Sequence, residues 1–372
     1  MFQVWSIEQS QWTCKIDEGS AGLVACCWTP DSRHILTTSD FQLRMTLWSL
    51  VNKTISYIKY PKLVQGGVDF SKNGKYMALV ERRDCKDYVS LFHCGDWQLV
   101  RNFQLDTKDV AGLAWSPDGK VMCVWDSVLD YKVLLYSIDG RCIASYSAYE
   151  HALGVKSVAW SPTSQFLAIG SYDQKVRVLN HVTWKTVAEH SHPSTVDFNS
   201  VVVYTEMEKK LPLSKAVGSA FAATQSTICP SQSKYETSEI PCTIPTIKPD
   251  PEKPNPKLGV GNVLFSCDSK YMATKNDNMP NVVWIWDVTK LSLAVLLLQS
   301  NPIREFLWDP LQSRLAICTA NSKLYLWSPA GCLSVLVPTE STVTVQKMIW
   351  HHSGTALALI GGTYFCICYF NE

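Results

Sequence analysis

The chain has 372 residues, of which 46% are hydrophobic, so it is long enough for one large core or for two domains. Its 34 lysines and arginines balance 33 aspartates and glutamates, which excludes a global field that would attract nucleic acid or an anionic membrane. Apolar runs such as LAVLLL at 293–298 are far too short to span a bilayer, and no secretory signal opens the chain. None of the fourteen cysteines falls in a C-x-x-C motif, so we expect buried free thiols in a reducing compartment.

The first predicted element is a strand at 2–6, FQVWS, which alternates apolar and polar residues. The same pattern returns as LWSL at 47–50 and as LYLWSP at 324–329, each near the end of a longer unit. The chain therefore opens on what resembles the third strand of a repeat.

Seven internal repeats follow, each recognised by a segment that begins with tryptophan or phenylalanine. They begin at Trp28, Phe70, Trp115, Trp160, Phe265, Trp308 and Trp350. Successive segments start 42 to 45 residues apart, except for one interval of 105 residues. One repeat therefore contains a long insertion.

Each repeat has the same internal order, which the third repeat shows most clearly. The segment Ser116-Pro117-Asp118-Gly119 is a typical turn, because proline presets φ and glycine ends the turn without Cβ strain. Short apolar strands follow, and those such as VVWIW at 282–286 are apolar on both faces, as in a sheet between two other sheets. Four short strands in each unit of this length predict an all-β fold, a seven-bladed β-propeller.

The long interval corresponds to residues 191–257, where seven prolines lie between positions 230 and 256. So many prolines exclude regular structure, and only VVVY at 201–204 has the pattern of a strand. We therefore predict three parts: closing strands and blades 1–4 at 1–190, a largely disordered insert at 191–257, and blades 5–7 at 258–372. Deleting the insert is then expected to leave the melting temperature nearly unchanged.

The last blade poses a problem of strand order. Residues 345–350, 355–360 and 364–370 are expected to supply its first three strands, and 12–16 its fourth. The strand at 2–6 is then surplus, since it would occupy the same position as 364–370. We expect 2–6 to fold back as an extra outer strand or to fray.

These repeats resemble the WD-repeat family, and several segments resemble one family within it more closely. YMALVERRDCKDYVSLF at 76–92, SVAWSPTSQFLAIGSYDQKVRVLNHVTWK at 157–185 and RLAICTANSKLYLWSPAGC at 314–332 are similar to the WD-repeat proteins encoded antisense to a p53-family tumour gene, the WRAP seventy-three family. The resemblance covers nearly all of the chain outside 191–257. It implies a seven-bladed WD-repeat β-propeller with one long inserted loop.

The resemblance also implies a function that composition and periodicity do not reveal. It implies a non-enzymatic scaffold at the centrosome, centriolar satellites and spindle poles, in microtubule anchoring, spindle assembly and ciliogenesis. The implied partner is a coiled-coil protein, the afadin- and alpha-actinin-binding protein. Relatives begin with about two further repeats, so the chain is expected to be N-terminally short, which puts intact partner binding in doubt.

The repeats depart from the WD signature in one respect. No Gly-His pair occurs, and Trp-Asp ends a third strand only at Trp286-Asp287. We therefore expect the buried hydrogen-bond relay of the family to be mostly missing.

Two polar turns are the candidate partner-binding sites. The first contains three cations and three anions, an arrangement that favours complementary docking; its residues are Glu81, Arg82, Arg83, Asp84, Lys86 and Asp87. The alternative is a solvated turn whose charges pair with one another. The second, in the equivalent turn of the fifth blade, is Asn276, Asp277 and Asn278.

No metal, cofactor or catalytic site is predicted. His190-Ser-His192 and His351-His352 lack a third ligand at a recognisable spacing, so exposed or capping histidines are expected. The nucleophile-elbow, P-loop and dinucleotide motifs are absent. An adaptor in another cytosolic or nuclear complex and an RNA-binding propeller remain as alternatives, and the second requires a basic face with stacking aromatics.

Overall fold

The computed structural model describes residues 2–6, 9, 11–39, 44–63, 66–197, 201–209, 232–250, 252, 255–337 and 344–370. The chain divides into two compact units, residues 1–155 and 156–372. In the described ranges nearly all regular structure is β, with a single 3₁₀ turn, η1 (Gly19–Ala21). The predicted all-β class is therefore confirmed.

The first unit consists of three four-stranded antiparallel sheets and one hairpin. The sheets follow the order β3-β4-β5-β6, β10-β9-β8-β7 and β11-β12-β13-β14. Their strands are β3 (Ala25–Trp28), β4 (His34–Thr38), β5 (Arg44–Ser49), β6 (Ile55–Lys59), β7 (Val68–Phe70), β8 (Tyr76–Arg83), β9 (Lys86–His93), β10 (Leu99–Gln104), β11 (Val110–Trp115), β12 (Val121–Asp126), β13 (Val133–Ser137) and β14 (Cys142–Tyr146). Each sheet is one predicted blade.

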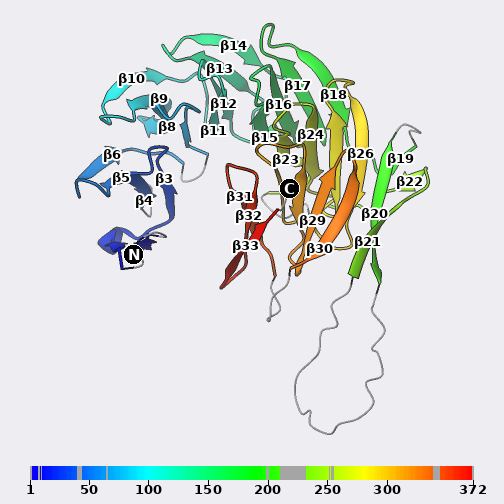
Figure 1. The fold of residues 1–372 in the computed structure, drawn as a ribbon. Coiled ribbons are helices and arrows are strands. Elements are labelled where there is room, and N and C mark those ends of the chain that lie inside the picture. The colour runs from blue at the N-terminus through cyan, green and yellow to red at the C-terminus, as the bar shows by residue number, and fades with distance from the viewer. Residues whose placement is uncertain are drawn as a thin grey trace. The chain divides into compact units, whose positions relative to one another are not determined.

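The second unit contains four further blade sheets, which lie side by side (Figure 1). Blade 4 is β15 (Val155–Trp160), which begins at the unit boundary, β16 (Phe166–Ser171), β17 (Lys175–Asn180) and β18 (Thr186–Ser191). Blade 5 contains β23 (Val260–Phe265), β24 (Tyr271–Asn276), β25 (Val282–Asp287) and β26 (Ser292–Leu298). Blade 6 is β27 (Glu305–Trp308), β28 (Leu315–Cys318), β29 (Lys323–Ser328) and β30 (Gly331–Leu336), and blade 7 is β31 (Lys347–Trp350), β32 (Ala356–Ile360) and β33 (Phe365–Tyr369). The two units together contain the seven predicted blades.

The turn that opens each blade forms as its sequence predicts. In blade 3, Gly119 has φ 72°, a left-handed conformation that glycine adopts without strain. The Ser116 hydroxyl donates to Asp118 at 2.6 Å and accepts the Val121 N–H at 3.0 Å, while the Gly119 N–H bonds the Ser116 carbonyl at 2.8 Å. This local network fixes the turn between β11 and β12.

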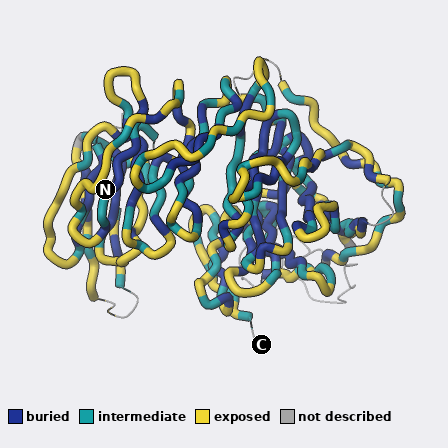
Figure 2. Tube along the Cα trace, turned by 90° about the horizontal axis from the view of Figure 1, so that it is seen from above, coloured by how far each residue is buried: buried dark blue, intermediate teal, exposed yellow. Residues whose placement is uncertain are grey.

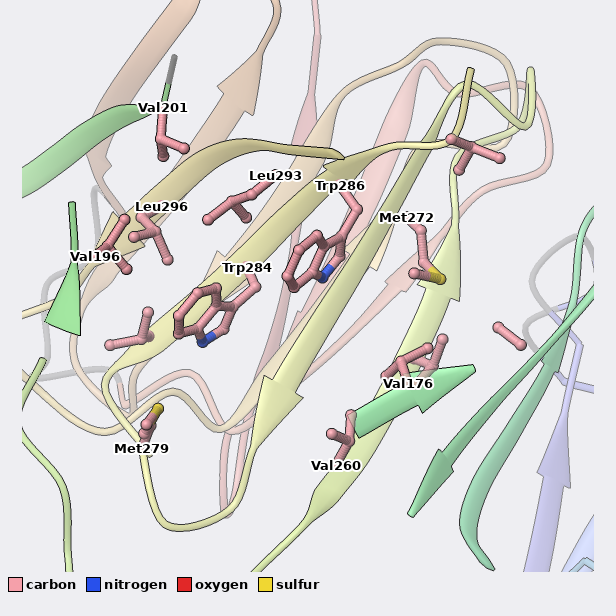
Figure 3. Packing of buried hydrophobic residues seen from close by; sticks show 14 of the residues in the cluster. Val176, Val196, Val201, Val260, Met272, Met279, Trp284, Trp286, Leu293 and Leu296 are labelled. Atoms are coloured by element: carbon pink, nitrogen blue, oxygen red, sulfur yellow. The ribbon is translucent and has the colours of Figure 1, made fainter. Parts of the chain in front are cut away.

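The middle strands are buried on both faces, and loops and outer strands carry the exposed residues (Figure 2). In β25 every residue from Val282 to Trp286 is buried. Trp284 and Trp286 lie parallel with ring centroids 5.8 Å apart, among Val176 of blade 4 and Leu296 of β26 (Figure 3). Such sheets are stabilised mainly by apolar area removed from water, about 25 cal/mol per Å².

The described parts of the insert carry more structure than their prolines predict. They contain β19 (Thr195–Val196), β20 (Val202–Lys209), β21 (Gln232–Thr237) and β22 (Cys242–Thr243). The strand β20 pairs in parallel with β26 through Val202 to Thr205, and β21 pairs with β20, so blade 5 is a six-stranded sheet. The prediction of a largely disordered insert is therefore wrong for these strands, while 198–200 and 210–231 lie outside the described residues.

The insert hairpin is held by a buried polar network around Glu206, which is only 4% exposed. One carboxylate oxygen accepts the Ser233 hydroxyl at 2.6 Å and the Tyr325 hydroxyl at 2.7 Å. The other accepts the Ser300 N–H at 2.9 Å. These bonds join the hairpin to blades 5 and 6, a contact that proline content does not indicate.

The strand at 2–6 folds back as predicted. The strand β1 (Phe2–Trp5) pairs antiparallel with β2 (Thr13–Ile16), and Val4 and Ile16 pack on Ile35 of β4. The segment 364–370 supplies the third strand of blade 7, also as predicted. The assignment of 12–16 as the fourth strand of that blade stays a prediction.

Candidate protein-interaction surface

The first predicted site is the tip of the hairpin between β8 and β9. Asp84 and Cys85 both adopt left-handed conformations, with φ 49° and 59°, as in a two-residue hairpin turn with positive φ at both positions. Arg83 and Lys86 are cross-strand partners at the end of the ladder. All four residues from 83 to 86 are exposed, so the tip presents charges of both signs to solvent.

Asp87, by contrast, is buried and serves the packing of the unit. Its carboxylate accepts the Val110 N–H at 2.7 Å and the Thr107 hydroxyl at 3.0 Å, both from the next blade. The Lys62 ammonium lies 2.9 Å away and the Arg82 guanidinium 3.3 Å. Asp87 therefore holds blades 2 and 3 together and does not face a partner.

The remaining charges of this turn pair with one another. Glu81 is buried and bonds the Arg83 guanidinium. Arg82 lies 2.6 Å from Asp109, and the hydrogen bond from Lys62 lowers the pKa of the Asp109 carboxyl. The structure thus combines both interpretations of the sequence: Glu81 pairs with Arg83, Arg82 pairs with Asp87 and Asp109, and residues 83 to 86 at the tip are exposed.

The second predicted site is a contact between blades 4 and 5. The buried side-chain amides of Asn276 and Asn278 both donate to the Gln174 side-chain oxygen, at 3.1 and 2.9 Å. Asp277 lies 2.7 Å from the Lys156 ammonium. Burial removes Asn276 and Asn278 from the candidate partner surface, and Asp277 is partly exposed.

Sequence analysis missed a buried relay in the second unit. His192 bonds the Thr274 hydroxyl at 2.8 Å, and the Trp286 indole N–H donates to the same hydroxyl at 2.9 Å. His190 stacks on Trp286 with ring centroids 4.4 Å apart. Burial lowers the pKa of both histidines to about 4, so the prediction of exposed or capping histidines is wrong here.

A second relay occupies the first unit, with a carboxylate in the place of the imidazole. Buried Glu18 accepts bonds from the Thr37 hydroxyl and the Trp48 indole N–H. The expectation that the relay is mostly missing is thus corrected in these two blades. The signal was hidden because the insert separates His192 in sequence from the blade that it serves, and because Glu18 does not match a Gly-His motif.

Within the described ranges, no group of three His, Cys, Asp or Glu side chains is placed to hold a metal ion. No described helix is long and apolar enough to cross a membrane. The described cysteines are free thiols. Cys94, Cys123 and Cys318 are buried as expected, whereas Cys26, Cys27, Cys85 and Cys142 are exposed, which corrects the expectation for those four.

Comparisons with known proteins agree with this architecture. The family model described as WD domain, G-beta repeat, matches residues 140–180. The mouse WD repeat-containing protein WRAP73 is 56% identical over an alignment that covers 99% of this chain and 80% of that protein. A WD repeat-containing protein of Schizosaccharomyces pombe is 24% identical, with 93% of this chain and 70% of that protein covered.

A solved structure gives the same fold. A chain from a structure titled "Crystal Structure of Mitotic Checkpoint Complex" superposes with a TM-score of 0.52 at 12% identity, covering 94% of this chain and 95% of that one. At this identity the likeness concerns the fold alone. The repeat match, the blade sheets and the identity to the mouse protein together show that this chain belongs to the WRAP73 family of WD-repeat proteins, which have a β-propeller fold.

Proposed function

We propose that this protein is an interaction scaffold at the centrosome, centriolar satellites and spindle poles, in microtubule anchoring, spindle assembly and ciliogenesis. WD-repeat propellers generally mediate protein–protein contacts and are generally non-enzymatic. The observation that carries the proposal is the 56% identity to mouse WRAP73 along 99% of the chain. It supports the place of action that the sequence resemblance implies.

The proposed partner is the coiled-coil afadin- and alpha-actinin-binding protein, and the proposed contact is the exposed hairpin tip. Arg83, Asp84 and Lys86 carry both signs of charge, which favours register and specificity over simple attraction. Glu81 and Asp87 are left out of this surface because they are buried, and Arg82 because it pairs with Asp87 and Asp109.

Reversal of a single exposed charge tests the contact. Lys86→Glu should lower the recovery of the coiled-coil partner with the tagged full chain from cell extracts. Lys120→Glu is the matched control, because its side chain is exposed in the same unit, in the turn before β12. Both variants should keep their stability within about 0.5 kcal/mol. Equal partner recovery with both variants would remove the hairpin tip from the contact.

The place of action is tested separately by imaging the tagged chain in dividing and ciliated cells. Accumulation at centrosomes and spindle poles is expected. A diffuse distribution together with no recovery of the coiled-coil partner would instead favour an adaptor of another complex.

A further inference from the structure

A basic cluster lies at one end of the inner strands of the second unit. Its members are Lys156 in β15, Lys257 before β23, Lys275 in β24 and Arg304 before β27. The Lys156 ammonium donates to the Leu258 carbonyl at 2.7 Å, and the Lys275 ammonium to the Ile303 carbonyl at 2.8 Å. Both carbonyls lie just before the first strand of the next blade, so each ammonium is held where two blades meet.

The blade fold does not require a cation at these positions, as the other repeats show. The repeats can be aligned on the tryptophan or phenylalanine that begins each repeat segment, and the strand register agrees with this alignment. The position of Lys275 then holds Thr38, Val80, Trp125, Gly170, Cys318 and Ile360 in the other repeats. The position that Lys156 and Arg304 share holds Val24, Gly66, Ala111, Gly261 and Gln346. The basic cluster is therefore a feature of blades 4 to 6 and not of the repeat.

The charge of Lys275 is unfavourable for the folded unit. Burial lowers the pKa of its ammonium, and the charges of Arg304 and Lys257 lower it further, although Asp277 acts in the opposite direction. The fold thus keeps a positive charge where burial and two neighbours disfavour it. Perturbed charges of this kind cluster at functional sites.

The cluster has more positive than negative charge. Asp277 lies 2.7 Å from the Lys156 ammonium. Glu305, which acts on Cys318 together with Arg304 and Lys275, accepts the Met348 N–H at 2.5 Å. Four cations therefore face two carboxylates. Lys257 and Arg304 are exposed, so the excess charge faces solvent.

The ligand that this charge fits is an acidic protein segment. The ion pair of Lys156 with Asp277 shows that the cluster accepts a carboxylate, and the guanidinium of Arg304 can bind a carboxylate through two parallel bonds. Single-stranded nucleic acid needs an exposed aromatic ring on which a base can stack. The ring next to Lys156 is that of Tyr172, which is only 8% exposed and lies under the ammonium at 4.6 Å from the ring centroid. Carboxylates therefore fit this cluster better than stacked bases do.

We infer that the basic cluster of blades 4 to 6 is a binding site for an acidic segment of a partner protein, whose carboxylates pair with Lys275 and Arg304. The inference rests on the proposed scaffold function and deepens it. It names a contact of defined charge that is separate from the hairpin tip of the first unit.

The test measures fluorescence anisotropy of the labelled peptide GEDEEDG, with both ends capped, during titration with the purified full chain. Binding is expected at concentrations up to about 1 mM, and it should weaken when salt is raised from about 50 to about 200 mM. The control peptide GQNQQNG has the same length without the charges and should not bind.

Two lysine variants make the test specific for the cluster. Lys275→Met removes the ammonium but keeps an unbranched side chain, and should weaken peptide binding by about tenfold. Lys270→Met is the matched control, because Lys270 lies at the other end of β24, is 66% exposed and pairs with Asp268. It removes the same charge and should leave the affinity unchanged. Arg304→Gln, at an exposed position, should weaken binding by about threefold.

The melting temperature separates binding from folding. Lys275→Met should not lower it, because methionine removes a disfavoured charge. If this variant fails to fold, Arg304→Gln decides the test. The inference is overturned by no binding at about 1 mM, or by equal affinities of the native chain and the folded cluster variant. Tighter binding of an oligouridine than of the peptide, lost in the cluster variant, would assign the cluster to nucleic acid instead.

The outcome is separable from that of the proposed function. Specific peptide binding, together with failure to recover the coiled-coil partner, would reject that partner and leave the acidic-segment site intact. Recovery of the partner without peptide binding would reject the site and leave the partner.

Discussion

Replacement of Glu206 by alanine tests whether the insert hairpin is part of the folded core. The carboxylate accepts three bonds, from the Ser233 and Tyr325 hydroxyls and from the Ser300 N–H. Alanine would leave all three donors without this acceptor. A buried donor left unsatisfied costs about 1–3 kcal/mol, and because such terms are not additive we expect a total loss of about 3–5 kcal/mol.

The assay compares urea unfolding, followed by tryptophan fluorescence, with hydrogen exchange of β20 and β21. Glu206→Ala should lower the free energy of unfolding of the second unit and increase exchange in both strands. Glu236→Ala is the matched control, because Glu236 is an exposed glutamate on β21 opposite Thr205. It should change stability by no more than about 0.5 kcal/mol. If Glu206→Ala behaved like this control, the hairpin would not be held by the network.

Three further predictions concern the same packing. Deletion of 191–257 removes β20 and His192, so the melting temperature should fall by several degrees or more, in contrast to the expectation from sequence. An unchanged melting temperature by calorimetry would restore the interpretation of the insert as disordered. Burial lowers the pKa of His190 and His192 to about 4. Between about pH 6.5 and 4 the unfolded state therefore binds more protons than the folded state. The free energy of unfolding falls as pH falls through this window, by an upper limit of about 3 kcal/mol for each histidine. In His192→Gln the pH dependence of unfolding should be shallower, and an equal slope would contradict this. Asp87→Asn leaves the charges of Lys62 and Arg82 without their buried partner. It should lower the free energy of unfolding of the first unit, measured in urea, by about 2–4 kcal/mol. A change below about 0.5 kcal/mol would show that Asp87 is not the central acceptor of these bonds.

Local signals predicted the blades well. The turn at Ser116 to Gly119 is specified by side chains within five residues, and it forms with those residues in those roles. The doubly apolar pattern of VVWIW predicted a strand buried on both faces, and β25 is buried in that way. Both signals could be recognised because their causes lie close together in sequence.

The candidate sites were predicted less well. Both polar turns exist, but sequence does not distinguish a charge that faces solvent from one that holds two blades together. Asp87 is buried because Val110 and Thr107 of the next blade supply donors to it, and Asn276 is buried because Gln174 of the preceding blade accepts its amide. Exposure of a polar turn therefore depends on neighbours that lie far along the chain.

By itself the sequence determined the all-β class and the number of blades, because turn chemistry and burial on both faces repeat every 42 to 45 residues outside one interval of 105. The family was indicated separately, by the resemblance of particular segments such as 76–92 and 157–185. Only the tertiary structure decided that the insert contributes β20 and β21 to blade 5 and that Glu206 is their anchor. The physical reason is that β20 gains its partners from β26 and from Tyr325, which are distant in sequence, so no local pattern shows the bonds that offset the loop-closure entropy. The prolines of the insert limit helix and central strands, but they do not indicate where the rest of that segment will pack.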